Sequence, residues 1–326
     1  MNETKTHYQK MIAELMDGSR GLTRRSLQEY SDIPPEALQA VLEAWPNIKL
    51  DRKRTLLEGL QSLNESDTLV SFDDFARALL TDPEAEVRLR AMRLLDECDD
   101  VKLIPIFLKM LAGDPDSETR AEAASSLGKY IELGELEEIP AKTQRQVEDA
   151  LLEKANSEDS LIVRRNSLEA LGYSSRPEVI TLIESAYHRS NPDWQASALF
   201  AMGRSYDERW EDQVLSSLLD DSPIVRLAAV EAAGELALTS ARTILFQVLE
   251  EEEEDEITSA AIWSLSQVGG EDVRVYLENL IDLAEDDEQT EFLQEALDNL
   301  VFTEEMSSFD LMTYDSDEAD EADEEE

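Results

Sequence analysis

The sequence predicts an all-α fold, a right-handed solenoid of about seven helix pairs. Three observations support it. A short pattern recurs along the chain at intervals of about thirty residues, as helical repeat arrays do. Between these points, apolar residues follow the three-to-four-residue spacing of amphipathic helices. Gly and Pro number only 11 and 10 in 326 residues, which disfavours a turn-rich β fold.

The recurring point is a dipeptide whose first residue is mostly apolar and whose second is mostly Arg. Successive copies are separated by 32, 44, 31, 31 and 32 residues, and a weaker seventh copy falls at Gln289-Thr290. The long step carries an insertion around residues 133–146. The six clear copies are Val87-Arg88, Thr119-Arg120, Val163-Arg164, Trp194-Gln195, Val225-Arg226 and Ile257-Thr258.

Each copy has similar surroundings, which predict two helices joined by a tight turn. An acidic residue precedes the Arg by six positions in four copies, and a second segment of helical apolar spacing precedes the acid. Asp-Pro and Ser-Pro dipeptides mark the turn and the start of the second helix, because Pro is tolerated in a first turn. A Gly follows the second helix's apolar stretch in several copies, and we expect it to end that helix.

This pattern resembles the HEAT repeats, in particular the short HEAT-like repeats of the phycobilisome-lyase type, with their D-x-x-x-x-V-R-x-x-A-A-x-x-L-G signature. The resemblance covers roughly Leu79 to Leu300, and upstream it extends to a degenerate helix pair around Arg54. It implies an armadillo-type superhelix. It leaves the function open, because this repeat serves many unrelated tasks.

The resemblance also implies a role for the repeated Arg, since in that family turn acids and helix Arg residues form a ladder along the solenoid. An Arg in an otherwise apolar helix must be paired, or its burial costs several kcal/mol. We expect Asp220 to be the partner of Arg226, and the ladder to be interrupted at Gln195 and Thr258. The predicted structural ladder comprises Asp82, Arg88, Asp114, Arg120, Glu158, Arg164, Asp220 and Arg226.

The net charge of −46 is unevenly distributed along the chain. Residues 1–60 hold nine basic and nine acidic residues, whereas residues 207–326 hold four Arg, no Lys and 38 acids, a net charge of −34. Such a field repels nucleic acid and anionic membranes and favours a basic protein partner. The single Cys98 excludes an internal disulfide framework, and with no recognisable secretory signal we expect a cytoplasmic location.

We find no catalytic signature in the sequence and expect no enzyme, no cofactor and no metal site. The chain resembles deoxyhypusine hydroxylase only at the level of its repeats, and its two histidines, His7 and His188, do not supply the His-Glu pairs of that di-iron site. A Gly-rich phosphate loop and a G-x-S-x-G elbow are absent. The acids around Cys98 would raise its thiol pKa, which disfavours a nucleophile. A phycobilin-lyase-like or other enzyme subunit is a less favoured alternative.

In the resembled family the second helix of each pair lines the concave face. Counting from the first residue of each dipeptide, the third and sixth positions should point into that groove. Phe292 stands at the third position, and Phe200 and Trp263 stand at the sixth. A buried core position for both rings is the alternative, because element boundaries are uncertain by a few residues. The residues predicted to contact a partner on the concave face are Arg90, Arg93, Arg165, Glu169, Phe200, Glu231 and Trp263.

These observations divide the chain into an N-terminal helical cap with a degenerate repeat (1–78), a repeat solenoid (79–303) and an acidic disordered tail (304–326). Within the tail, FDLMTY (309–314) is either a cap on the last repeat or a linear motif. The function predicted is a non-enzymatic scaffold that binds a protein partner on its concave face. An acidic, chaperone-like binder of basic proteins and head-to-tail self-association are the alternatives.

Overall fold

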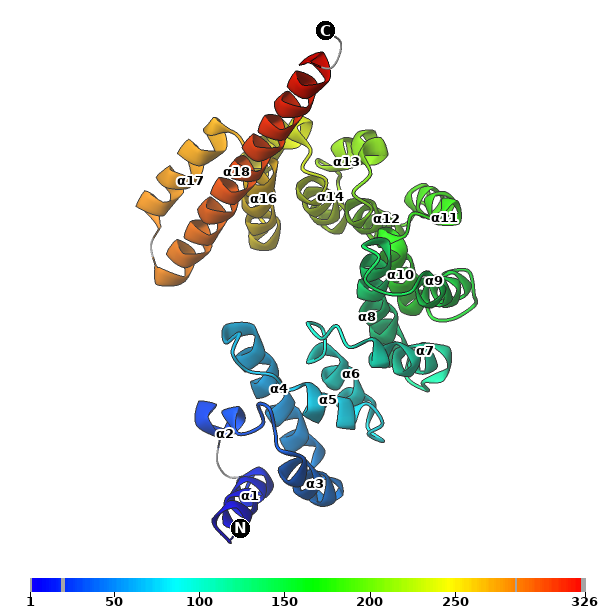
Figure 1. Cartoon of the computed structure of the whole chain (residues 1–326), viewed down its shortest axis with the longest axis vertical. Helices are drawn as coiled ribbons and strands as arrows, with labels where there is room; N and C mark the ends of the chain where they lie inside the picture. The colour runs from blue at the N-terminus through cyan, green and yellow to red at the C-terminus, as the bar shows by residue number, and fades with distance from the viewer. Residues whose placement is uncertain (1, 19–20, 285, 324–326) are drawn as a thin grey trace. The chain divides into compact units, whose positions relative to one another are not determined.

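The computed structural model describes the whole chain except residues 1, 19–20, 285 and 324–326, and except the side chains of residues 1–7 and 306–326. It divides into two compact units, Met1–Ala170 and Leu171–Glu326, called unit 1 and unit 2 below. Every regular element in the described residues is helical, and helices are the only elements in Figure 1. No helix in the described part of the chain is both long and apolar enough to cross a membrane.

Unit 1 contains ten α-helices, of which the last six form three consecutive pairs. The second helices of these pairs pack side by side in the order α6, α8, α10, and α4 extends this row at its N-terminal end. Helix α1 packs on α3 and α4. The bounds are α1 (Asn2–Met16), α2 (Arg24–Gln28), α3 (Pro35–Ala44), α4 (Leu50–Ser66), α5 (Asp73–Leu79), α6 (Ala85–Arg93), α7 (Ile104–Gly113), α8 (Ser117–Glu135), α9 (Ala141–Ala155) and α10 (Leu161–Ala170).

Unit 2 consists of four further pairs, whose second helices α12, α14, α16 and α18 pack in one row (Figure 1). The first helices, α11, α13, α15 and α17, each pack on the second helix of their own pair. The bounds are α11 (Pro177–Tyr187), α12 (Pro192–Arg204), α13 (Glu211–Ser217), α14 (Pro223–Glu235), α15 (Arg242–Glu251), α16 (Asp255–Val268), α17 (Glu271–Leu283) and α18 (Asp287–Asp323). The predicted all-α repeat fold is confirmed, with seven pairs among the described residues.

Three of the repeated Arg residues, Arg88, Arg120 and Arg226, join consecutive helix pairs through the same three contacts. In unit 1, the Arg88 Nε and Nη2 atoms donate to the two carboxylate oxygens of Asp114 at 2.8 and 2.6 Å, while Nη1 donates to the Asp82 carbonyl at 2.8 Å. In unit 2, Arg226 binds Glu252 at 2.8 and 3.0 Å and the Asp220 carbonyl at 3.0 Å. We call each two-pronged pair a rung. It matches the fixed fork of the guanidinium to a carboxylate.

The rungs correct the predicted pairing within each repeat, because the carboxylate partner comes from the next repeat. The carboxylate of Asp220 instead accepts a hydrogen bond of 2.8 Å from the Ser222 N–H. It therefore points toward the turn that contains it and away from Arg226. Only its main-chain carbonyl faces Arg226. The guanidinium therefore reaches past its own turn to the carboxylate of the following one.

The rung between the second and third helix pairs uses a carboxylate one residue beyond the predicted one. Arg120 binds Asp159, at 3.2 Å from Nε and 2.6 Å from Nη2, and not Glu158, which is exposed. The predicted pair of Glu158 with Arg164 is not formed among the described residues; Arg164 donates to the Ala155 carbonyl at 3.3 Å.

An additional ion pair, formed by a lysine in place of the arginine, precedes the predicted ladder. The Lys53 ammonium lies 3.2 Å from the Asp82 carboxylate, which also accepts a 2.6 Å hydrogen bond from the Trp45 indole. Both members of this ion pair are buried. The sequence pattern placed the degenerate repeat around Arg54, but Lys53 occupies the rung position and Arg54 instead binds Glu86.

The repeated Gly does not end the second helices, contrary to the sequence prediction. Gly234 lies inside α14, which ends at Glu235, and the chain then turns at Ala237, whose φ is 48°. The Ala237 and Leu238 N–H groups close the helix end by donating to carbonyls of the last turn at 2.8 and 3.0 Å. The Gly is needed for close packing instead. A Cβ on it would lie 2.9 Å from the Ser264 Cα of the next second helix.

The predicted domain limits at 78/79 and 303/304 stay predictions, and a helix runs through each of these points. The boundary at 78/79 falls within α5, whereas the division between compact units lies at 170/171. The segment predicted to be a disordered tail continues helix α18 to Asp323. Glu and Ala are good helix formers, and extending an existing helix avoids the cost of nucleating a new one. Residues 324–326 and the side chains of FDLMTY lie outside the described part.

Exchanging each candidate carboxylate for its amide tests which one forms the Arg226 rung. Glu252→Gln removes the charge that accepts both prongs, so we expect the free energy of unfolding to fall by about 1.5–3 kcal/mol, as for hydrogen bonds between charged groups. Asp220→Asn should change it by less than about 0.5 kcal/mol, because an amide oxygen can still accept from Ser222. Urea denaturation of the full chain gives both values. Equal losses of unfolding free energy in the two variants would instead support the pairing of Arg226 with Asp220 in its own repeat.

Adding one methyl group at Gly234 tests the close packing of α14 on α16. Gly234→Ala places its Cβ against Ser264, so we expect a loss of about 1–3 kcal/mol from overpacking. Gly113→Ala is the control, because a Cβ at this last residue of α7 meets no atom within 4 Å. That change should leave stability unchanged or raise it by up to about 1 kcal/mol. A stabilised Gly234→Ala variant, measured in the same urea titration, would show that the helices do not need the Gly.

Candidate functional site

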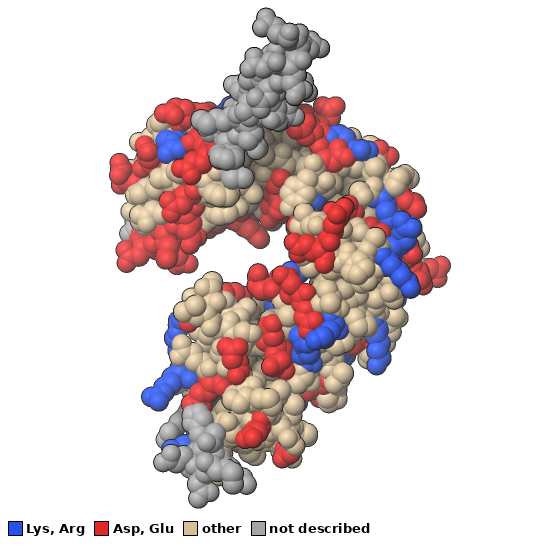
Figure 2. All heavy atoms as spheres, viewed as in Figure 1, with Lys and Arg blue, Asp and Glu red and all other residues tan. Residues whose placement is uncertain are grey.

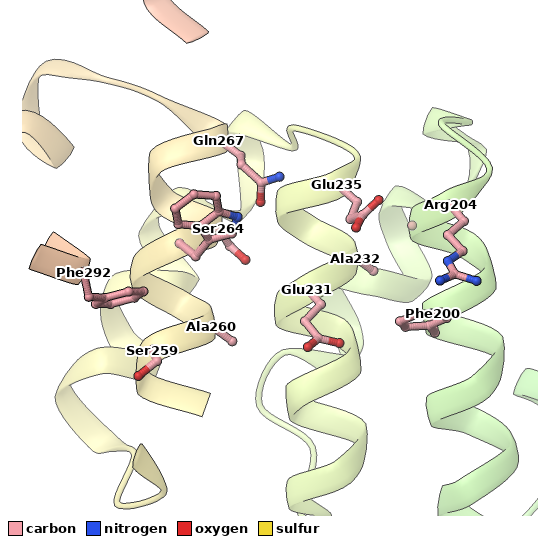
Figure 3. A pocket seen from close by; sticks show the side chains of 12 residues that line it. Phe200, Arg204, Glu231, Ala232, Glu235, Ser259, Ala260, Ser264, Gln267 and Phe292 are labelled. Carbon is pink, nitrogen blue, oxygen red and sulfur yellow. The ribbon is translucent and has the colours of Figure 1, made fainter. Parts of the chain in front are cut away.

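A pocket of about 380 Å³ opens on the row of second helices in unit 2 (Figure 3). It crosses four helices, so each wall belongs to a different repeat. Side chains of α12, α14 and α18 project into it in Figure 3. Its lining residues are Phe200, Gly203, Arg204, Glu231, Ala232, Glu235, Ser259, Ala260, Trp263, Ser264, Gln267 and Phe292.

The repeat register brings the key side chains together. Phe200, Glu231 and Trp263 hold the same position in successive repeats, so they form one column across α12, α14 and α16 with the acid between the two rings. Small residues beside them let the helices approach closely: a Cβ on Gly203 would lie 3.0 Å from the Ala232 Cα. The Ser264 hydroxyl also crosses to α14, donating to the Val230 carbonyl at 2.8 Å.

Both predicted aromatic residues lie at the pocket wall and not in the core. Trp263 is 38% exposed, an unusual value for so large an apolar side chain in this chain, whose other three tryptophans are buried. Phe200 is partly covered by Arg204, whose guanidinium carbon lies 4.2 Å from the ring centroid. Figure 3 shows this guanidinium lying over the Phe200 ring on the same helix.

Glu231 is a half-buried carboxylate that has no hydrogen bond or ion pair to any described residue. Burial raises its pKa, and the nearby charges of Glu235 and Glu256 raise it further, whereas Arg204 only partly opposes them. A carboxylate in this situation disfavours the folded state whenever it is ionised. The pocket therefore holds an unmatched negative charge between two aromatic rings.

The predicted contact residues of unit 1 are arranged differently. Arg90 binds Glu58 at 2.8 Å and Glu86 at 3.3 Å. Arg93 binds Glu122 at 3.2 Å. The remaining two, Arg165 and Glu169, are half-buried on α10. Arg90 and Arg93 are thus each paired with acids of their own unit.

Arg204 and Glu235 were missed as pocket residues by the sequence analysis. They stand four positions after Phe200 and Glu231, and residues so spaced lie on the same face of a helix. That spacing was the available signal. Phe292, three positions after Gln289, was in the predicted groove register and closes the pocket from α18.

The other groups considered for chemistry lie apart from this pocket. Burial, and then a hydrogen bond with Asp73, raises the pKa of the Cys98 thiol, the direction expected from the surrounding acids. His188 ends α11 and packs against the Tyr187 ring at 5.4 Å. Among the described residues, no group of three or more His, Cys, Asp or Glu side chains is arranged to hold a metal ion.

The row of packed helix pairs described above is an α-solenoid. The chain belongs to the HEAT-repeat proteins. The family description of HEAT repeats matches residues 73–144 and 211–300. These ranges fall within α5–α9 and α13–α18, and the second one contains the nine residues that line the pocket from α14, α16 and α18. No curated protein matches the sequence.

Several solved structures have a similar fold. The complex of CpcE and CpcF of phycocyanin lyase from Nostoc sp. PCC7120 is 18% identical, with a TM-score of 0.51 over 82% of this chain and 95% of that one. YibA of Escherichia coli is 17% identical, with a TM-score of 0.42 over 86% and 98%. Human deoxyhypusine hydroxylase is 19% identical, with a TM-score of 0.35 over 81% and 96%. At these identities the likeness concerns the fold alone.

Neutralising Glu231 should stabilise the free protein at neutral pH. Its raised pKa means that the destabilisation appears as the pH rises above the ordinary value of 4.5 and is complete above the folded-state pKa. We therefore expect Glu231→Gln to raise the melting temperature at pH 7, with the gain disappearing below about pH 4.

The matched control is Glu250→Gln, which removes the same charge from an exposed position on α15. It corrects for the general relief of repulsion in so acidic a protein. Thermal unfolding followed by circular dichroism at pH 7 and at low pH gives both values. If the two variants gain equally at pH 7, Glu231 is not an electrostatic liability of the free protein.

Proposed function

We propose that this chain is a non-enzymatic, cytoplasmic scaffold that binds a basic protein partner through the second-helix face of unit 2. The observation that carries the proposal is the pocket built by Phe200, Trp263 and Phe292 around Glu231. Exposed aromatic residues that are surrounded by polar groups are frequent anchors of protein partners. The HEAT-repeat solenoid supports a role in protein interaction in general.

The charge of unit 2 supports a basic partner. It holds 7 Arg, no Lys and 41 Asp or Glu, a net charge of −34, whereas unit 1 holds 22 bases and 34 acids. Acidic side chains crowd the visible surface around α16 and α17 in Figure 2. This field attracts a basic surface over a distance of about 8–10 Å at physiological salt and repels an acidic one.

Quantitative affinity capture from the native cell tests the proposal. Full-length protein, the Trp263→Ala variant and the Phe200→Ala/Trp263→Ala variant serve as baits at physiological salt, with circular dichroism to confirm that each is folded. We expect both variants to lose at least about tenfold of one or more basic proteins, as when an interface anchor is removed.

Val275→Ala is the matched control, because it shortens a half-exposed apolar side chain on α17, outside the pocket. It should capture the same proteins as the wild type. Retention of every wild-type partner by the folded double variant would contradict this binding face.

A further inference from the structure

We propose that the unit 2 pocket binds the guanidinium group of an arginine from an extended segment of the partner, seated on Trp263 and paired with Glu231. This inference rests on the proposed function and specifies its binding chemistry. The occupant is a protein segment and not a folded surface. A pocket of about 380 Å³ lies near the lower end of the 300–1,000 Å³ range of ligand pockets, so it accommodates an anchoring side chain.

The unmatched Glu231 requires a cation. Its carboxylate faces two further acids, and the described residues give it no hydrogen-bond donor. An incoming guanidinium would supply two N–H groups in a planar fork and cancel the charge. An apolar or acidic side chain at the same place would leave the carboxylate buried and unpaired, at a greater cost than in the open pocket.

The same pocket already shows how it receives a guanidinium. The guanidinium carbon of Arg204 lies 4.2 Å from the centroid of the Phe200 ring and 5.0 Å from that of the Tyr173 ring. Trp263 holds the equivalent position two repeats on, but no cation of the described chain lies on its indole, and it remains 38% exposed. Trp is the best aromatic partner for a cation. The second half of the pocket therefore repeats the first half without its guanidinium.

Arginine suits this position better than lysine. Its guanidinium is planar, stacks on an aromatic face and is more weakly hydrated than an ammonium, so it is transferred into a half-buried pocket at lower cost. It also reaches a carboxylate with two parallel hydrogen bonds, as each rung of this fold does. Lysine can offer only a point charge.

Two short peptides test the inference directly. One carries a single arginine between leucines, and its twin carries citrulline, which has the same shape and no charge. Binding is followed by Trp263 fluorescence, because Trp45, Trp194 and Trp210 are buried, and Trp263→Phe identifies the signal. At physiological salt we expect the arginine peptide to bind the full chain at least about tenfold more tightly than the citrulline peptide, as for a hydrogen bond between charged groups.

The variant Glu231→Gln should reduce this preference to about twofold or less, because the charge pairing is removed. Glu250→Gln, which removes one exposed charge outside the pocket, should keep the full preference. A lysine peptide should bind more weakly than the arginine peptide.

Each remaining outcome overturns the inference. It fails if neither peptide binds up to the solubility limit, if lysine is preferred, or if Glu231→Gln weakens both peptides equally. The proposed function fails separately, when the Phe200→Ala/Trp263→Ala bait retains all partners. A bait that loses its partners, together with peptides that show no charge preference, would leave the binding face in place and remove only the arginine chemistry.

Discussion

The register between consecutive second helices is the constraint on which the rest of this structure depends. Each rung fixes the start of one second helix against the turn that precedes the next, because the guanidinium binds two carboxylate oxygens and a carbonyl at once. A Gly further along the helix, such as Gly234, then lets the next helix approach. With both ends of the contact fixed, residues at equivalent repeat positions must form straight columns. The alignment of Glu231 on α14 with Trp263 on α16 follows from the Arg226 rung, whereas Phe200 on α12 is aligned with Glu231 by the close packing of Gly203 on Ala232.

The two units differ in how the charges on their second helices are paired. In unit 1 the acids of the second-helix face have cations within the same unit, such as Arg90 beside Glu58 and Arg93 beside Glu122. Unit 2 lacks Lys altogether, and Gln195 and Thr258 replace two of its rung arginines. Fewer fixed cations leave the acids of unit 2 with less internal compensation. Glu231 is one acid of unit 2 with which no cation among the described residues pairs. It lies in the same pocket as Phe200 and Trp263.

The fold could be predicted from the sequence because the repeat period is visible in every copy, whereas the partners of its charged residues could not. Asp220 and Glu252 both lie within reach of Arg226 by spacing alone, and only the direction in which each carboxylate turns distinguishes them. The Gly positions were recognised, but a Gly near a helix end fits both termination and close packing. The aromatic column was found from the period. Arg204 and Glu235 were missed because the prediction did not extend to the next helical turn, four residues after Phe200 and Glu231.

An unpaired, half-buried carboxylate is a costly feature of the free protein. Simple packing gives no reason for Glu231, because a neutral side chain of similar size, such as Gln, would fill the same space without the desolvation cost. Solubility gives none either, since exposed acids are abundant elsewhere in unit 2. The cost is offset only in a state where a cation reaches the carboxylate. Stability given up in the free protein and recovered in a complex is the expected energetic pattern of a binding residue, and it distinguishes Glu231 from the acids that only surround it.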